Sequence, residues 1–158
     1  MVRIGIGYDS HRLVPDRPLL LGSVTIPFDR GLLGHSDGDV VLHAVTDALL
    51  GAAALPDIGE LFPDTDPAYQ DADSAQLLRQ ALAKLAAKGY HPHNVDVVIH
   101  AERPKLSAHK IAMRTAMAAL LGIDVDDVNV KAKTAEGLGD IGAGNAIACT
   151  AVATITRR

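Results

Sequence analysis

Apolar residues recur along this chain in two patterns, and the first of them predicts strands. Residues 2–8 form a mostly apolar run that two glycines interrupt. Two three-residue apolar runs, 19–21 and 24–26, flank a Gly-Ser pair and end at a proline, which is typical of a hairpin. Segments rich in β-branched residues predict three more strands, at 95–100, 128–133 and 147–155.

The second pattern, apolar residues three and four positions apart, predicts helices. The first helix is apolar around most of its circumference but carries a polar stripe that includes Asp39 and His43. Ser107 is expected to cap the third helix, and a glycine closes each of the last two. The three helices are expected at 39–54, 74–88 and 108–121.

Strands that alternate with helices predict a two-layer α/β (α+β) fold, in which the helices cover one face of a sheet. The chain has 158 residues and no linker or repeat, so a single domain over residues 1–158 is expected. Only 3% of the residues are aromatic, so small and aliphatic side chains must fill the core. The other face of the sheet then needs a cover, which a symmetric copy of the chain can supply.

Composition and charge narrow the class of protein. No apolar run approaches the ~20 residues that a membrane-spanning helix needs. A net charge of −4 with scattered Lys and Arg argues against a nucleic-acid partner. Met1 leads directly into the first predicted strand, which leaves no room for a signal peptide, and the single cysteine, Cys149, favours a reducing compartment. A cytoplasmic protein that acts on a small molecule is expected.

Asp9, His11 and His43 form the strongest candidate site. Residues i and i+2 of a strand point to the same face, so Asp9 and His11 can hold one ion, and His43 can supply a third ligand. Three N and O ligands with an open fourth position are typical of a catalytic zinc, whereas a structural zinc is usually closed by thiolates. The competing interpretation is a turn-capping Asp beside two hydrogen-bonded histidines.

Three polar loops add candidate chemistry. The loop from His35 to Asp39 enters the first helix, where backbone N–H groups attract phosphate, although its residues can equally serve as caps. Residues 57–67 form an acidic loop in which Asp57 can reach a polyol hydroxyl. Residues 131–139 end a strand with Lys, Thr and Glu together, which can hold a diphosphate and Mg²⁺ or simply form a turn.

The most informative motifs lie in five ordered segments that span nearly the whole chain. They are Gly-Tyr-Asp-Ser-His-Arg-Leu (7–13), Gly-His-Ser-Asp-Gly-Asp-Val-Val-Leu-His (34–43), Asp-Ile-Gly-Glu-Leu-Phe-Pro-Asp-Thr-Asp (57–66), Arg-Pro-Lys (103–105) and Val-Asn-Val-Lys-Ala-Lys-Thr-Ala-Glu (128–136). Together they resemble the 2-C-methyl-D-erythritol 2,4-cyclodiphosphate synthases, the zinc-dependent cyclases of the non-mevalonate isoprenoid pathway. The resemblance implies a mixed sheet with helices on one face, assembled into a homotrimer whose sheets face a central cavity and whose active sites lie between subunits.

The resemblance also implies roles for individual residues. The zinc ligands match Asp9, His11 and His43. The segment that binds the methylerythritol phosphate end of the substrate matches His35, Ser36, Asp57 and Gly59. The cytidine pocket matches Ala101, Pro104, Lys105, Leu106, Ala132 and Lys133. The diphosphate and Mg²⁺ contacts match Thr134 and Glu136, and the residues expected to act in catalysis are His35, Thr134 and Glu136.

Two positions depart from the pattern of the family. Lys133 stands where a small hydroxylated residue is frequent. The segment 139–145 lacks the Phe and Arg that similar proteins often place near the trimer axis. The second departure bears on whether the central cavity binds an isoprenoid diphosphate.

The implied reaction is a cyclisation. The 2-phosphate of 4-diphosphocytidyl-2-C-methyl-D-erythritol 2-phosphate attacks its own β-phosphorus and releases CMP, which makes the enzyme a phosphorus–oxygen lyase. Both reacting groups are anionic, so Zn²⁺ and Mg²⁺ are expected to neutralise them. Two other classes stay open: a mononuclear zinc hydrolase with Glu136 or Asp57 as general base, and a nucleotide-binding or metal-storage module without catalysis.

Overall fold

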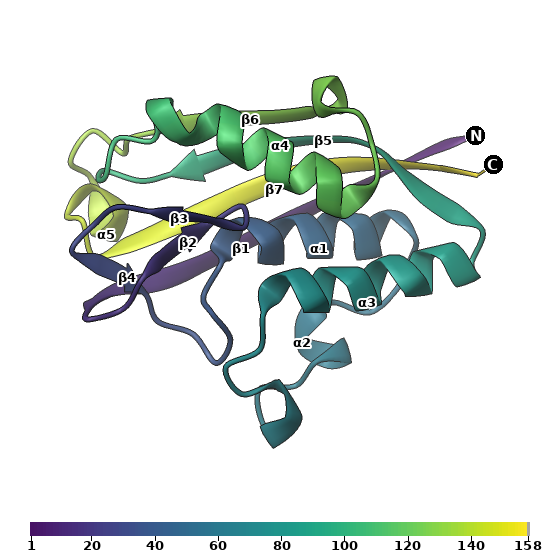
Figure 1. Ribbon diagram of the computed structural model, residues 1–158, viewed down its shortest axis with the longest axis horizontal. Helices are drawn as coiled ribbons and strands as arrows, with labels where there is room; N and C mark the ends of the chain where they lie inside the picture. The colour runs from purple at the N-terminus through teal and green to yellow at the C-terminus, as the bar shows by residue number, and fades with distance from the viewer. Residues whose placement is uncertain (158) are drawn as a thin grey trace.

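The computed structural model describes residues 1–157, which form a mixed five-stranded sheet and a separate hairpin (Figure 1). The strands are β1 (Val2–Pro15), β2 (Leu19–Leu21), β3 (Val24–Ile26), β4 (Arg30–Leu32), β5 (Tyr90–His100), β6 (Val128–Lys133) and β7 (Ala146–Arg157). The sheet has the order β4-β1-β7-β5-β6, in which only β5 and β6 run parallel. β2 and β3 form the hairpin.

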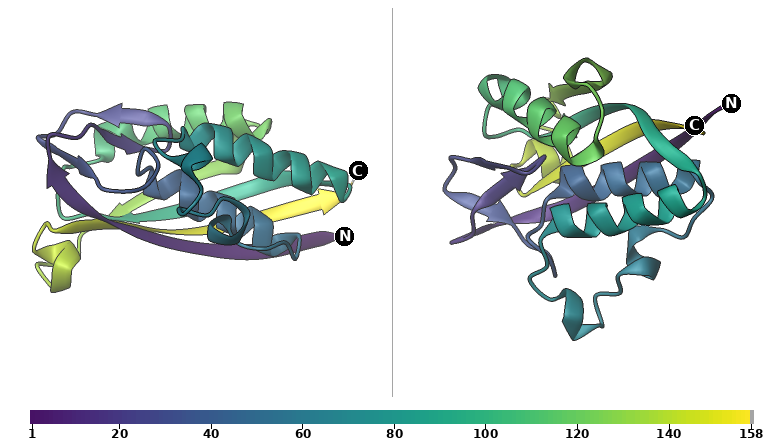
Figure 2. Two further views of the ribbon diagram at one scale, coloured as in Figure 1. Left: turned by 90° about the horizontal axis from the view of Figure 1, so that it is seen from below. Right: turned by 45° about the vertical axis from the view of Figure 1, so that its right-hand side comes forward.

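Three long helices lie on one side of the sheet, as Figure 2 shows. They are α1 (Val40–Ala52), α3 (Ser74–Ala87) and α4 (Lys110–Leu121), and two single-turn helices, α2 (Ile58–Leu61) and α5 (Gly139–Gly142), lie in loops. The interface between the helices and the sheet is aliphatic, and Leu42, Leu49 and Ile99 are fully buried in it. The predicted two-layer α/β arrangement is therefore confirmed. None of the helices in residues 1–157 is long and apolar enough to cross a membrane.

The opposite side of the sheet carries none of the three long helices and is called the open face below. Here the first half of β1 presents a column of four apolar side chains, each at least 58% exposed. They are Val2, Ile4, Ile6 and Tyr8. A contiguous apolar column is unusual on a free surface and marks a place where another surface binds.

Two glycines of β1 let α1 pack directly on the strand backbone. A Cβ atom at Gly7 would lie 2.0 Å from the carbonyl oxygen of Ala44, and one at Gly5 would lie 2.0 Å from that of Ala48. No side chain fits into these gaps, so the glycines set the distance between β1 and α1. This distance matters because Ala44 follows His43 directly in the sequence.

Substituting Gly7 with alanine is therefore expected to push α1 away from β1. The obstructing atoms belong to the helix backbone, which cannot move aside as a side chain can. We therefore expect the free energy of unfolding to fall by about 1–3 kcal/mol or more. Gly51→Ala is the matched control, since the atom nearest to a Cβ there is 4.0 Å away. Urea denaturation of both variants measures the difference, and equal stability of Gly7→Ala and the unmodified chain would contradict the packing argument.

The structure corrects several predicted boundaries. The predicted hairpin and the strand at 128–133 are confirmed, but the first strand continues beyond residue 8 to Pro15, because its polar residues up to Arg12 pair with β7 and its last three residues pair with β4. The prediction that Ser107 caps a helix is wrong. Ser107 lies inside a 3₁₀ turn, Ser107–His109, and α4 begins after this turn without a side-chain cap. The short elements β4, α2 and α5 were not predicted.

Candidate metal centre and neighbouring cavities

The three predicted metal ligands come from two elements that the glycine contact holds together. Asp9 and His11 lie on β1, on the side of the sheet that faces α1, and His43 lies in the first turn of α1. The start of α1 is fixed by Asp39, whose carboxylate accepts hydrogen bonds from the N–H groups of Leu42 (3.1 Å) and Gly22 (2.9 Å). The predicted capping role of Asp39 is thus confirmed.

The ligand atoms form a nearly equilateral triangle. Asp9 Oδ2 lies 3.0 Å from His11 Nε2 and 3.0 Å from His43 Nδ1, and the two nitrogens are 3.1 Å apart. In a tetrahedral zinc site with bonds of 2.0–2.1 Å, neighbouring ligand atoms are about 3.3 Å apart. The triangle and its donor set of one carboxylate and two imidazoles therefore fit a zinc ion with a free fourth position.

The same contacts set the charges of the triangle. Burial alone would raise the pKa of Asp9, but the hydrogen bonds with His11 and His43 outweigh it and hold this pKa well below its usual range. For His43, burial favours the neutral ring, but the hydrogen bond and the negative charge of Asp9 raise its pKa. Asp9 is thus an ionised carboxylate at neutral pH, as metal binding requires.

The second nitrogen of His43 is occupied by hydroxyl groups. His43 Nε2 lies 2.9 Å from Ser74 Oγ and 3.0 Å from Ser36 Oγ, and the Ser74 hydroxyl also contacts the carboxylate of Asp37. Ser74 did not stand out in the sequence as a site residue, because it is 31 residues away from His43 and only the fold brings it there.

A cavity of about 390 Å³ opens beside the triangle. Of the residues predicted for the methylerythritol phosphate end, His35, Ser36 and Gly59 line it. His35 Nε2 is buried and has no hydrogen-bond partner within residues 1–157, so it is free to donate to a bound molecule. The cavity is completed by Ile58, Phe62, Asp64, Tyr69 and Leu77.

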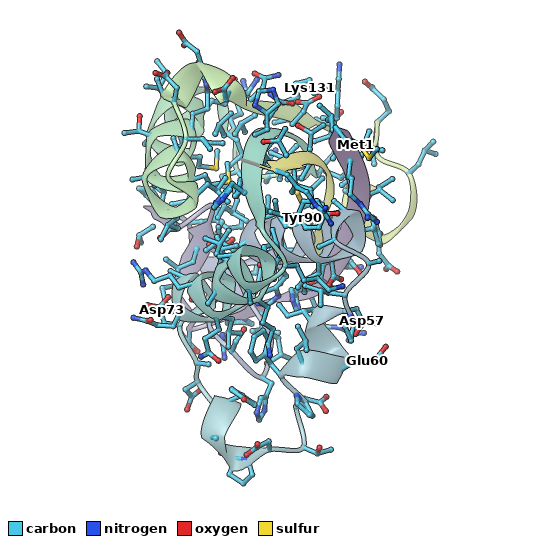
Figure 3. All side chains as sticks on the ribbon, turned by 90° about the vertical axis from the view of Figure 1, so that its right-hand side faces the viewer. Met1, Asp57, Glu60, Asp73, Tyr90 and Lys131 are labelled. Atoms are coloured by element: carbon cyan, nitrogen blue, oxygen red, sulfur yellow. The ribbon has the colours of Figure 1, made fainter. Side chains whose placement is uncertain are left out.

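Asp57 does not line this cavity and instead caps α2, where its carboxylate accepts the N–H of Glu60 at 2.9 Å. Figure 3 shows both residues at this short helix. A residue that the sequence did not single out for the site, Asp47, ties α2 to α1 by accepting the N–H of Ile58 at 2.8 Å. Burial raises the pKa of Asp47. Asp47 thereby positions Ile58 and Gly59 at the cavity wall.

A second cavity, of about 280 Å³, contains the whole predicted cytidine-binding set. Two loops meet there, because Ala101 N–H donates to Lys133 O (2.9 Å) and Ala135 N–H donates to the carboxylate of Glu102 (3.1 Å). Glu136 is exposed beside this cavity, with its N–H 3.4 Å from Thr134 Oγ1. The predicted residues that line the cavity are Ala101, Pro104, Lys105, Leu106, Ala132, Lys133 and Thr134.

The two cavities lie on different strands of the sheet. The register places Asp9 opposite Cys149 on β7, Cys149 opposite Ile99 on β5, and Ile99 opposite Ala132 on β6. Three strand spacings amount to about 14 Å between Asp9 and Ala132. Ile99 and Cys149, which lie between them, are fully buried. One chain thus holds the metal triangle and the second cavity apart, with core side chains between them.

Comparisons with known proteins agree with this geometry. The model of the YgbB family matches residues 2–156. The chain is 59% identical over 155 residues to the 2-C-methyl-D-erythritol 2,4-cyclodiphosphate synthase of Bordetella petrii, covering 98% of this chain and 96% of the relative. It is 53% identical over 156 residues to the synthase of Alkaliphilus oremlandii, covering 99% of both. A solved 2C-methyl-D-erythritol-2,4-cyclodiphosphate synthase in a CDP-bound form matches with a TM-score of 0.90 and 42% identity, over 98% of this chain and 100% of that one. The chain therefore belongs to the YgbB family, among the 2-C-methyl-D-erythritol 2,4-cyclodiphosphate synthases.

Proposed function

We propose that this chain converts 4-diphosphocytidyl-2-C-methyl-D-erythritol 2-phosphate to 2-C-methyl-D-erythritol 2,4-cyclodiphosphate and CMP, in the non-mevalonate isoprenoid pathway. An oxygen of the 2-phosphate forms a bond to the β-phosphorus, and the bond from this phosphorus to the oxygen that bridges it to the α-phosphorus breaks. CMP leaves with that oxygen and its electron pair. The observation that carries the proposal is the Asp9–His11–His43 triangle, in a chain that matches the synthases over its whole length.

Two divalent cations belong to the proposal. We assign Zn²⁺, or another first-row metal, to Asp9, His11 and His43, and Mg²⁺ or Mn²⁺ to Glu136 together with substrate phosphate oxygens. When bound, these cations supply Lewis acidity and neutralise the charge of the diphosphate. The triangle of donor atoms supports the first assignment, and the exposure of Glu136 next to the second cavity supports the second.

The side chains of the chain then bind and orient the substrate. His35 donates a hydrogen bond from its unpartnered Nε2 to a phosphate oxygen, and Ser36 and Gly59 border the same space. Asp57 caps α2 outside this cavity, so its proposed contact with an erythritol hydroxyl requires its carboxylate to turn away from the N–H of Glu60. At the other end, Thr134 donates its hydroxyl to the diphosphate. Holding the two phosphate groups of one molecule together removes most of the entropic barrier to their reaction, a contribution of about 7–11 kcal/mol in favourable cases.

The cytidine end is assigned to the second cavity, whose lining combines apolar and cationic groups. Ala101, Leu106 and Ala132 offer apolar contacts to a base, while Lys105 and Lys133 attract phosphates. The CDP-bound form of the solved relative supports a cytidine nucleotide as the ligand. The substrate has the nucleotide and the methylerythritol phosphate at opposite ends of its diphosphate, so one molecule must contact both cavities.

This requirement supports active sites that lie between subunits, which we assign to a homotrimer. Buried residues separate the two cavities within one chain, whereas the second cavity of a neighbouring copy can approach the metal triangle from outside. The apolar column of Val2, Ile4, Ile6 and Tyr8 supports an assembly in which the open faces of the sheets surround a central cavity. The working enzyme is therefore proposed to be a ring of three copies.

The product distribution tests the proposed reaction. The purified protein, loaded with Zn²⁺ and Mg²⁺, is incubated with the cytidylyl substrate in ¹⁸O-labelled water and followed by ³¹P NMR and mass spectrometry. We expect equal amounts of CMP and cyclic diphosphate, neither carrying ¹⁸O, because the attacking oxygen comes from the substrate. Label in the phosphate products would favour the zinc hydrolase, and no turnover would favour a module without catalysis. Neither alternative is favoured by the comparisons, since the relatives are synthases.

A further inference from the structure

We propose that Asp37 and Ser74 act as positioning residues, which hold His43 in the one tautomer whose Nδ1 can bind a metal ion. The proposal rests on the metal role assigned to the Asp9–His11–His43 triangle and adds two residues to it. It concerns only groups that lie behind His43, on the side of the ring away from the triangle.

The contacts form a continuous chain from a carboxylate to the ligand nitrogen. Asp37 contacts the hydroxyl of Ser74, Ser74 Oγ lies 2.9 Å from His43 Nε2, and His43 Nδ1 is part of the metal triangle. Ser74 is 1% exposed and His43 8%. Bulk water therefore cannot readily replace either partner, and an unpaired group at this place would be costly.

The contact between Asp37 and Ser74 determines which groups donate and which accept in the hydrogen bonds from Asp37 to His43. The Ser74 hydroxyl donates its only hydrogen to the carboxylate of Asp37. Ser74 Oγ is then left with lone pairs towards His43 and must accept a hydrogen from Nε2. With its hydrogen on Nε2, a neutral His43 has the free lone pair on Nδ1, the atom that faces Asp9 and His11.

Asp37 is itself fixed by the backbone. Its carboxylate accepts the N–H groups of Asp39 and Ser74, each at 3.0 Å, and its own N–H donates to Ala72 O at 3.1 Å. A further bond joins Asp71 N–H to His35 O at 2.8 Å. Hydrogen bonds thus join the loop before α1 to the start of α3 on both sides of the Asp37–Ser74 contact. They leave the carboxylate of Asp37 little freedom to rotate.

Ser36 is the alternative partner of His43, but its hydroxyl is held less firmly. Ser36 Oγ lies 3.0 Å from His43 Nε2, and its other contacts are longer: 3.4 Å to Gly38 N and 3.5 Å to Ser74 Oγ. No carboxylate within residues 1–157 contacts it. Ser36 also lines the cavity beside the triangle, so its hydroxyl can bind the substrate while the Ser74 hydroxyl binds the ring of His43.

Zinc affinity of the metal-free protein, measured by competition with a chromophoric chelator, tests the proposal. Ser74→Ala is expected to weaken zinc binding about 10–100-fold, and Asp37→Asn to weaken it in the same direction. Asp73→Asn is the matched control for Asp37→Asn. Asp73 is an exposed residue directly before Ser74, labelled in Figure 3, and its carboxylate caps α3 by accepting the N–H of Ala75 at 2.9 Å. We expect the zinc affinity of Asp73→Asn to stay within about threefold of that of the unmodified chain. Ser36→Ala is expected to lose less zinc affinity than Ser74→Ala.

A measurement on the unmodified, zinc-loaded chain covers the case in which Ser74→Ala does not fold. Long-range ¹H–¹⁵N NMR should find the His43 hydrogen on Nε2 and none on Nδ1. Zinc affinities of Ser74→Ala and Asp37→Asn equal to that of the unmodified chain would overturn the positioning role alone. A His43 hydrogen on Nδ1 in the zinc-loaded chain would overturn the positioning role and also the assignment of Nδ1 as a zinc ligand. An unmodified chain that binds no zinc would overturn the proposed metal centre together with it.

Discussion

Replacement of His43 by alanine is expected to abolish stoichiometric zinc binding and to lower turnover by at least about 10³-fold, which corresponds to about 4 kcal/mol of transition-state stabilisation. His43 contributes one corner of a triangle whose sides are 3.0–3.1 Å, and within residues 1–157 no other His, Cys, Asp or Glu joins this group. Two ligands on one strand then remain, which cannot enclose an ion. Elemental analysis of the dialysed protein and the rate of CMP release measure the two effects.

Glu136→Gln is the matched control for this experiment. Glu136 lies in the loop after β6, outside the triangle and outside the cavity beside it. We expect this variant to keep about one zinc per chain but to lose most of its turnover and its dependence on Mg²⁺. Full zinc occupancy in His43→Ala, or loss of zinc in Glu136→Gln, would contradict the assignment of the two cations.

Mixing two inactive variants is expected to restore activity if each active site is shared between neighbouring subunits. His11→Ala removes a metal ligand, and a double variant of Lys105 and Lys133 to alanine removes the cations of the second cavity. In trimers formed at random from equal amounts of the two variants, a subunit has an intact triangle with a probability of one half, and its neighbour has an intact second cavity with a probability of one half. About one quarter of the interfaces then combine an intact triangle with an intact second cavity, so recovery to about a quarter of the unmodified activity is expected.

Subunit exchange must be demonstrated independently, for example by native mass spectrometry of isotope-labelled and unlabelled chains. Each variant alone provides the baseline, and the Lys105 and Lys133 double variant should still bind zinc. A monomer in light scattering at the assay concentration, or confirmed exchange without any recovery, would remove the shared site. The metal triangle would stand in either case.

The sequence was sufficient to predict the metal triangle because its side chains are distinctive metal ligands. Asp9 and His11 are two residues apart on a strand, and His43 lies in the polar stripe of a mostly apolar helix. The residues of the second cavity were predicted from the resemblance to the synthases alone, and the structure brings their two loops together. The contact of Ser74 with His43 could not be predicted from the sequence, because it depends on how the loop before α1 packs against the start of α3.

The same distinction holds for the fold. The strand at 128–133 and the hairpin follow from local apolar patterns and turn residues, and the structure has them where they were predicted. Residues 9–12 of β1 are polar and carry no such pattern, and they form a strand because they pair with β7, after which residues 13–15 pair with β4. The 3₁₀ turn that displaces the predicted cap at Ser107 likewise depends on tertiary contacts of the loop, with Leu106 almost fully buried beneath it.

β1 pairs with the nearby β4 over three residues, but its long pairing in the sheet is with β7 at the far end of the sequence, from Val2↔Thr156 to Arg12↔Ala146. Asp9 and His11 therefore stand on a strand whose partner is translated after every other element described here. A nascent chain in which β7 is still inside the ribosomal exit tunnel cannot form this pairing, and such a long-range contact forms late. We therefore expect a cation to enter a sheet in which β7 has already paired with β1, rather than to guide the folding of β1.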